Sequence, residues 1–96
     1  MSGYIDNLSQ AISAMHACGC SHFGTEHVRE EHDGALVWEG DVEIFQLEGH
    51  QKANVAYGWG WTGDSDDIQY IGILNVPPVV SATDAVKAAI ASGQFK

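Results

Sequence analysis

The segment from Leu36 to Leu47 alternates apolar and acidic residues, and this alternation limits the folds that the chain can adopt. The apolar residues at even positions are Leu36, Trp38, Val42 and Ile44. Glu39, Asp41 and Glu43 occupy the odd positions between them. Successive side chains of a β-strand point to opposite faces of its sheet, so the pattern predicts a half-buried strand with an acidic outer face. The fold must therefore contain a sheet with one buried side.

The other patterns predict elements that surround this strand. Apolar residues recur every three or four positions over residues 4–18, which predicts an amphipathic helix. Alternating runs separated by turn residues predict strands over residues 25–32, 36–47, 55–62 and 69–76. Asp33-Gly34 is the turn between the first two strands, and Ser81 predicts the cap of a second helix that ends at Gly93.

These elements predict one α+β domain over residues 1–96, a length within the range of a single core. We expect a two-layer sandwich in which an antiparallel sheet of three to four strands carries the N-terminal and C-terminal helices on one face, in the order α-β-β-β-(β)-α. The predicted core residues are Ile5, Leu8, Ile12, Met15, Trp38, Val42, Ile44, Val55, Tyr57, Trp59, Leu74, Val86 and Ile90.

Charge discriminates between two registers of the first hairpin. A two-residue loop would pair Glu26 with Asp41, so two carboxylates would face each other. A three-residue loop would instead set Arg29 opposite Glu39 and His27 opposite Asp41. Opposite charges across a strand pair are favourable and like charges are not, so the second register is predicted.

The next connection decides what lies beside the acidic stripe. A direct loop over residues 48–51 would set Ile44 opposite Val55 and would bring the apolar sides of both strands together. The stripe would then adjoin Gly58 and Gly60, which have no side chains to cover it. We therefore expect a flat, exposed and acidic outer face.

Composition excludes several classes of partner. The chain has 13 Asp and Glu against 4 Lys and Arg, which gives a formal net charge of -9. Such a charge repels phosphate backbones and anionic membranes, so direct nucleic-acid binding is not expected. The aromatic residues Tyr57, Trp59 and Trp61 are accordingly interpreted as core. The first basic residue is Arg29 and no apolar run approaches the ~20 residues of a membrane span, so we expect a soluble cytoplasmic protein.

Four potential metal ligands lie within a short segment. His16, Cys18, Cys20 and His22 carry the imidazole and thiolate groups that zinc accepts at tetrahedral corners. Structural zinc sites usually join two separated pairs of ligands, however, and a helix end at Gly19 would point these side chains in different directions. The favoured interpretation is that these four side chains pack against the fold. Zinc binding is the alternative interpretation.

Parts of the sequence resemble a family of short bacterial proteins with no assigned activity. The resemblance covers about residues 35 to 90 and is carried by V-W-E-G at 37–40, G-H-x-K-A at 49–53 and V-P-P at 76–78. It implies a bacterial cytoplasmic origin and carries no activity. The order of helix, three strands and helix is also similar to a double-stranded-RNA-binding domain, but the basic second helix of that fold is reduced here to Lys87.

The functional expectation follows from the acidic stripe and from the lack of a catalytic constellation. We expect a non-enzymatic protein-interaction module or homodimer that uses Glu39, Asp41 and Glu43, with a basic protein surface or a second copy as its partner. Two alternatives stay open. One is a metal-binding protein or enzyme with His16, Cys18, Cys20 and His22 as ligands. The other is an acidic mimic of nucleic acid that inhibits a DNA- or RNA-binding protein.

Overall fold

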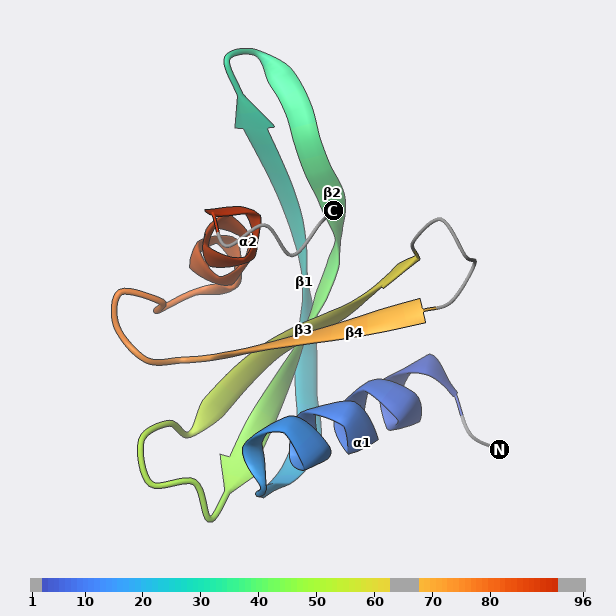
Figure 1. The fold of residues 1–96 in the computed structure, drawn as a ribbon, viewed down its shortest axis with the longest axis vertical. Coiled ribbons are helices and arrows are strands. Elements are labelled where there is room, and N and C mark those ends of the chain that lie inside the picture. Colours follow the sequence, from blue (N-terminus) through green and yellow to red (C-terminus); the bar gives the residue numbers. More distant parts are fainter. Residues whose placement is uncertain (1–2, 63–67, 92–96) are drawn as a thin grey trace.

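The computed structural model describes residues 3–62 and 68–91, and it confirms the α+β class and the predicted order of elements. The elements are α1 (Tyr4–His16), β1 (Gly19–His32), β2 (Ala35–Glu48), β3 (Val55–Thr62), β4 (Ile68–Leu74) and α2 (Ala82–Ala91). The strands form one antiparallel sheet in the order β1-β2-β3-β4, with the two helices at different places on it (Figure 1). The optional fourth strand of the prediction is therefore present.

The two helices pack against opposite sides of the sheet, so the expectation that both cover one face is wrong. The first cluster joins α2 to the sheet and consists of Val28, Val42, Tyr57, Trp59, Ile71, Val79, Ala82, Ala85, Val86 and Ala89. The second joins α1 to the sheet and consists of Leu8, Ile12, Phe45, Leu47 and Ala56. The cross-strand partners Phe45 and Ala56 belong to the second cluster, and the neighbouring partners Ile44 and Tyr57 pack in the first. Side chains of the two clusters therefore alternate along the strands and point to opposite faces.

Three glycines explain why α1 lies on the side that was expected to be exposed. A Cβ atom at Gly58 would lie 2.8 Å from Cδ1 of Ile12, and one at Gly72 would lie 2.9 Å from Cγ1 of the same residue. A Cβ atom at Gly60 would lie 2.8 Å from Cε1 of Tyr4. The bare backbone of β3 and β4 is thus the surface that receives α1.

The apolar stripe of α1 buries Leu8 and Ile12 completely. The helix ends two residues before the predicted position, because Ala17 adopts the left-handed conformation at φ 52° and ψ 46° and β1 begins at Gly19. Met15, in the last turn of α1, is 47% exposed and is not part of the core as predicted. The predicted core residues Leu8, Ile12, Val42, Tyr57, Trp59 and Val86 are buried.

The first hairpin confirms the charge-based register by a different route from the predicted one. His32 pairs with Ala35 around a two-residue turn in which Asp33 and Gly34 have φ values of 53° and 80°. A bulge then inserts Val37 between the partners of Glu30 and Glu31. Beyond the bulge, Arg29 lies opposite Glu39 and His27 lies opposite Asp41, as expected.

The predicted register of β2 and β3 is wrong by two residues. Ile44 pairs with Tyr57 rather than with Val55, and the backbone N–H of Leu47 donates to the carbonyl of Asn54. The loop is longer than expected, and Nδ1 of His50 accepts hydrogen bonds from two backbone N–H groups within it, those of Lys52 and Ala53. A shift of two residues keeps the same side chains on each face.

The N-terminal cap of α2 agrees with the sequence, and the predicted helix end at Gly93 lies outside the described residues. The backbone N–H of Asp84 donates to Oγ of Ser81, and Oδ2 of Asp84 accepts from the backbone N–H of Val80, both at 3.2 Å. Neither helix among the described residues is long and apolar enough to cross a membrane.

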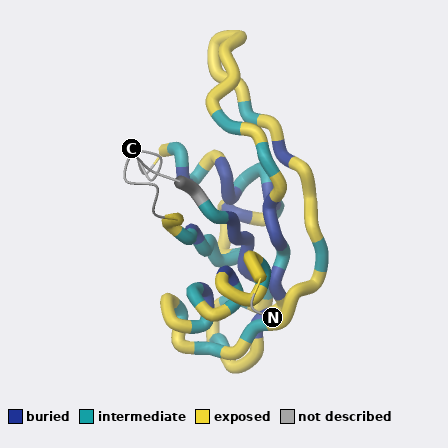
Figure 2. Tube along the Cα trace, turned by 90° about the vertical axis from the view of Figure 1, so that its right-hand side faces the viewer, coloured by how far each residue is buried: buried dark blue, intermediate teal, exposed yellow. Residues whose placement is uncertain are grey.

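The β1–β2 hairpin extends beyond the rest of the sheet. Pairing of β2 with β3 covers only residues 43–46 of β2, whereas β1 and β2 remain paired as far as the turn at Asp33-Gly34. We call residues 29–41 the arm; none of them is buried (Figure 2). The arm rises past α2 as a two-stranded ribbon (Figure 1).

Candidate functional site: the polar side of the β1–β2 hairpin

The predicted acidic stripe of β2 is divided between solvent and the interior. Glu39 and Asp41 are exposed, with side-chain exposures of 36% and 62%. Glu43 is only 6% exposed, so the expectation that it lies on the open face is wrong. The observed register places Glu43 beside Gly58, where α1 covers the sheet. Two exposed carboxylates of the predicted three are therefore available at the surface.

Glu43 is held by hydrogen bonds from β1. Its Oε1 atom accepts from Oγ1 of Thr25 at 2.5 Å and from the Nε2–H group of His22 at 2.8 Å. The ring of His22 also packs edge-on against Phe45, with centroids 5.5 Å apart. Buried carboxylates are tolerated when they are paired and hydrogen-bonded, so this arrangement is a stabilising contact within the fold.

Tyr4 closes the same side of the sheet from the first turn of α1. Its hydroxyl oxygen accepts a hydrogen bond from the backbone N–H of Gly60 at 2.6 Å. Burial raises the pKa of the Tyr4 hydroxyl, and the negative charge of Glu43 raises it further. The neutral phenol is thus the stable form at this position, and it ties α1 to β3.

His27 bridges the two exposed carboxylates. Its Nε2 atom lies 2.9 Å from Oε2 of Glu39, and its Nδ1 atom lies 3.0 Å from Oδ1 of Asp41. Each contact requires a hydrogen on the ring nitrogen, so the arrangement favours imidazolium. The pKa of His27 is raised by the hydrogen bond to Glu39 and then by the one to Asp41, while the pKa of Glu39 is lowered by the hydrogen bond from His27.

Arg29 continues the pairing toward the turn. Its guanidinium lies 2.7 Å from Oε2 of Glu31 and 3.4 Å from Oε1 of Glu39. Cationic groups of β1 thus face the carboxylates of β2 along one side of the hairpin. The stripe is a cross-strand charge ladder and not a row of free carboxylates.

The four residues considered as metal ligands have separate partners. Nε2 of His16 contacts the carbonyl of Gly72 at 3.1 Å, and Sγ of Cys20 lies 3.1 Å from Oγ of Ser9. Cys18 is partly buried against the cluster beneath α1, and His22 pairs with Glu43. Within residues 3–62 and 68–91, no three His, Cys, Asp or Glu side chains are grouped as a metal site requires.

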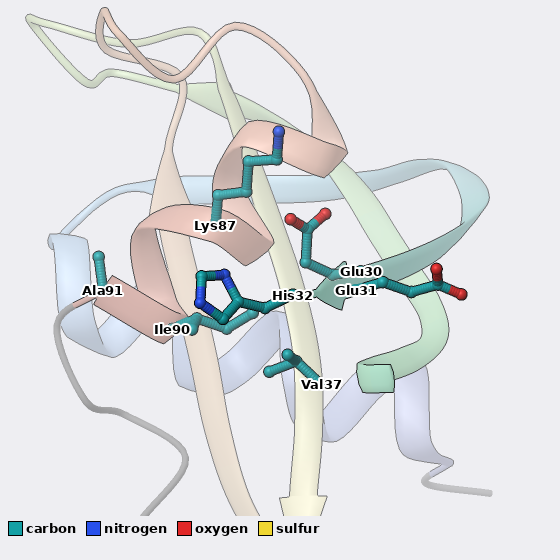
Figure 3. A pocket seen from close by; sticks show the side chains of 7 residues that line it. All are labelled: Glu30, Glu31, His32, Val37, Lys87, Ile90 and Ala91. Atoms are coloured by element: carbon teal, nitrogen blue, oxygen red, sulfur yellow. The ribbon is translucent and has the colours of Figure 1, made fainter. Parts of the chain in front are cut away.

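The opposite side of the arm bears a groove that the sequence pattern did not reveal. Val37, Ile90 and Ala91 line a cavity of about 350 Å³ between the arm and α2, and Lys87, Glu30, Glu31 and His32 surround it (Figure 3). Val37 is the inserted residue of the bulge, and strict alternation had placed it with the acidic residues. A bulge reorients side chains locally, and no residue type in this segment predicts a bulge.

Apolar side chains are also exposed at the end of the arm. Leu36 is 51% exposed and Val37 is 45% exposed. The aromatic residues Tyr57 and Trp59 of β3 are, by contrast, buried as predicted. The side chain of Trp61 and the residues 63–67 lie outside the described part of the chain. The arm therefore carries exposed carboxylates, the exposed aliphatic side chains of Leu36 and Val37, and a groove beside α2.

Comparison of the chain with models of protein families, with curated proteins and with solved structures finds no match.

Proposed function

We propose that the protein is a cytoplasmic, non-enzymatic interaction module and that the arm is the element that contacts its protein partner. The observation that carries the proposal is the projection of the hairpin beyond the sheet with Leu36 and Val37 exposed at its end. A solitary two-stranded ribbon gains little stability in water from its own pairing, so exposed aliphatic groups on it are better explained by contact with another molecule.

The charge of the arm points to a basic partner. Residues 29–41 contain five carboxylates and one arginine. Glu30 makes no ion pair with any described residue, and it stands at the edge of the groove (Figure 3). A partner that places an aliphatic side chain in the groove and lysine or arginine beside it would satisfy both properties. Two copies of the arm would repel each other, so a basic protein is favoured over a homodimer.

The open edge of β2 offers a second mode of contact for the same partner. Apart from the bulged Val37, residues 36–42 of β2 pair with β1 on one side and with no described strand on the other. An extended segment of the partner could add there as a further strand, with backbone hydrogen bonds supplying affinity and the groove supplying selectivity.

Quantitative capture from an extract of the native host tests this proposal. A double variant, Leu36→Ser with Val37→Ser, removes the exposed aliphatic groups and should lose the bound partner. Val80→Ser is the matched control, because Val80 is 66% exposed and lies before α2, away from the arm. Equal recovery of all proteins by both variants would contradict the proposal.

The nucleic-acid mimic is a narrower form of the same proposal. If the captured partner binds DNA or RNA, an added oligonucleotide should displace it from the arm. Partners that resist displacement would limit the function to a protein contact.

A further inference from the structure

Two adjoining pockets lie at the opposite end of the molecule from the arm, around the loop between β2 and β3. One has a volume of about 440 Å³ and is lined by His16, Gly49, His50, Gln51 and Lys52. The other has a volume of about 360 Å³ and is lined by His50, Gln51, Lys52, Ala53, Asn54 and Asn75. The shared residues are His50, Gln51 and Lys52, so the two form one continuous polar site beside the end of α1.

The lining of this site departs from the character of the chain. The sequence has 13 acidic residues and 4 Lys and Arg, yet no Asp or Glu of the described ranges 3–62 and 68–91 lines either pocket. Lys52 makes no ion pair with any described residue, whereas Arg29 is paired with both Glu31 and Glu39. Side-chain amides from Gln51, Asn54 and Asn75 supply further hydrogen-bond donors.

The fold determines which nitrogen of His50 carries the proton. Nδ1 accepts hydrogen bonds from the backbone N–H groups of Lys52 and Ala53, both at 3.1 Å. A neutral imidazole whose Nδ1 accepts has its hydrogen on Nε2, on the side of the ring away from the loop backbone. The nitrogen of His50 that the loop backbone leaves unused is therefore an N–H donor rather than a lone pair.

His16 fixes the wall of the site formed by α1. Its Nε2–H group donates to the carbonyl of Gly72 at 3.1 Å, and its ring meets His50 edge-on with centroids 6.3 Å apart. The two histidines do not form a metal site. Coordination through Nε2 of His50 would move its proton to Nδ1, where two backbone N–H groups already point.

We propose that this site binds a small molecule through an oxyanion group, a carboxylate or a phosphate, held by the ammonium of Lys52 and the Nε2–H group of His50. Both groups are donors, and a charge-assisted hydrogen bond from lysine is among the stronger contacts available to such a ligand. The net charge of the whole protein disfavours non-specific anion binding elsewhere, which makes local binding distinguishable.

The test is a pair of titrations of the full chain at constant ionic strength, one with inorganic phosphate and one with acetate. The amide chemical shifts are measured by NMR at each step. We expect saturable chemical-shift changes confined to Gly49, His50, Lys52 and Ala53. Comparison of the two titrations shows which oxyanion is preferred. Lys52→Gln should weaken binding by about tenfold or more, the factor that corresponds to loss of one charge-assisted hydrogen bond.

Two further variants make the result specific. His50→Asn keeps an acceptor for the loop backbone while it removes the outer N–H group, so it should weaken binding with the loop intact. Lys87→Gln makes the same change of charge beside the groove on α2 and should leave binding unchanged. Shifts that do not saturate with either anion, or equal losses in Lys52→Gln and Lys87→Gln, would overturn the proposal.

Discussion

At the scale of single residues, neighbours on β1 and α1 decide what each carboxylate of β2 does. Glu39, Asp41 and Glu43 have the same parity in the sequence, yet Glu43 is buried beneath α1 and the other two are exposed. The parity of the stripe could be predicted, because alternation fixes which side chains share a face. The burial of Glu43 could not be predicted, because it depends on where α1 lies.

The hydrogen bonds to Glu43 predict a stability effect. Replacing Glu43 with Ala leaves the Thr25 hydroxyl and the His22 ring without their partner, so we expect a loss of about 1–3 kcal/mol in the free energy of unfolding. Urea unfolding measures this loss. Asp41→Ala is the control, and its exposed side chain should change stability by less than about 0.5 kcal/mol. Similar effects for both variants would argue against a buried role for Glu43.

His27 predicts a pH dependence. Its pKa is raised above the ordinary value of 6.5 by hydrogen bonds to Glu39 and then to Asp41. A raised pKa means that the stabilising contribution of His27 is complete below 6.5 and is lost as the pH rises through the folded-state pKa. The lowered pKa of Glu39 acts in the opposite direction, and its contribution is lost as the pH falls through that value.

Titration of the His27 ring by NMR measures the shift directly. The midpoint should lie above 6.5 in the native protein and should fall in Glu39→Gln, which removes the first of the two charged acceptors. Asp41→Asn should lower it by less. A midpoint at or below 6.5, or one that neither variant changes, would show that the bridge does not persist in solution.

At the scale of elements, the local patterns were predicted well and the placement of α1 was not. The cap of α2 at Ser81 and the pairing of Arg29 with Glu39 follow from chemistry that acts over a few residues. The β2–β3 loop contains a side chain, His50, whose role as a backbone acceptor has no signature in the spacing of residues. Gly58 and Gly60 were interpreted as open surface, although close approach of a helix requires glycine equally.

The contact of α1 with these glycines predicts a coupled pair of substitutions. Gly58→Ala should destabilise the fold by about 1–3 kcal/mol, because the new methyl group would collide with Cδ1 of Ile12. Ile12→Val removes that carbon, so the double variant should lose less stability than the sum of the single variants. Denaturant unfolding of all three gives the coupling.

Gly24 provides the matched control for this cycle. A Cβ atom at Gly24 would meet nothing within 4 Å, so Gly24→Ala should be tolerated. Simple additivity of Gly58→Ala and Ile12→Val would mean that α1 does not rest on β3 in solution.

At the scale of the whole molecule, the packed sheet and the arm have different compositions. The sheet buries two apolar clusters between α1 and α2, whereas residues 29–41 include no fully buried side chain and carry five carboxylates. The charge of this segment can be read from the sequence, but its projection beyond the sheet cannot. The projection arises because the pairing of β2 with β3 stops at Glu43, which only the folded structure shows.

The acidic arm also predicts the state of the protein in solution. We expect a monomer of 10.3 kDa in sedimentation equilibrium at low salt, where repulsion between acidic arms is least screened. A stable dimer under these conditions would favour self-association over a basic partner.

Site-specific photo-crosslinking in the native host tests the central claim most directly. A benzophenone amino acid at Leu36 places the reactive group at the end of the arm, and the same group at Val80 occupies a still more exposed position before α2. We predict that Leu36 yields a discrete adduct with a basic protein and that Val80 does not. Adducts at Val80 alone, or none at Leu36 under conditions in which the protein is folded, would contradict the assignment of the arm as the contact element.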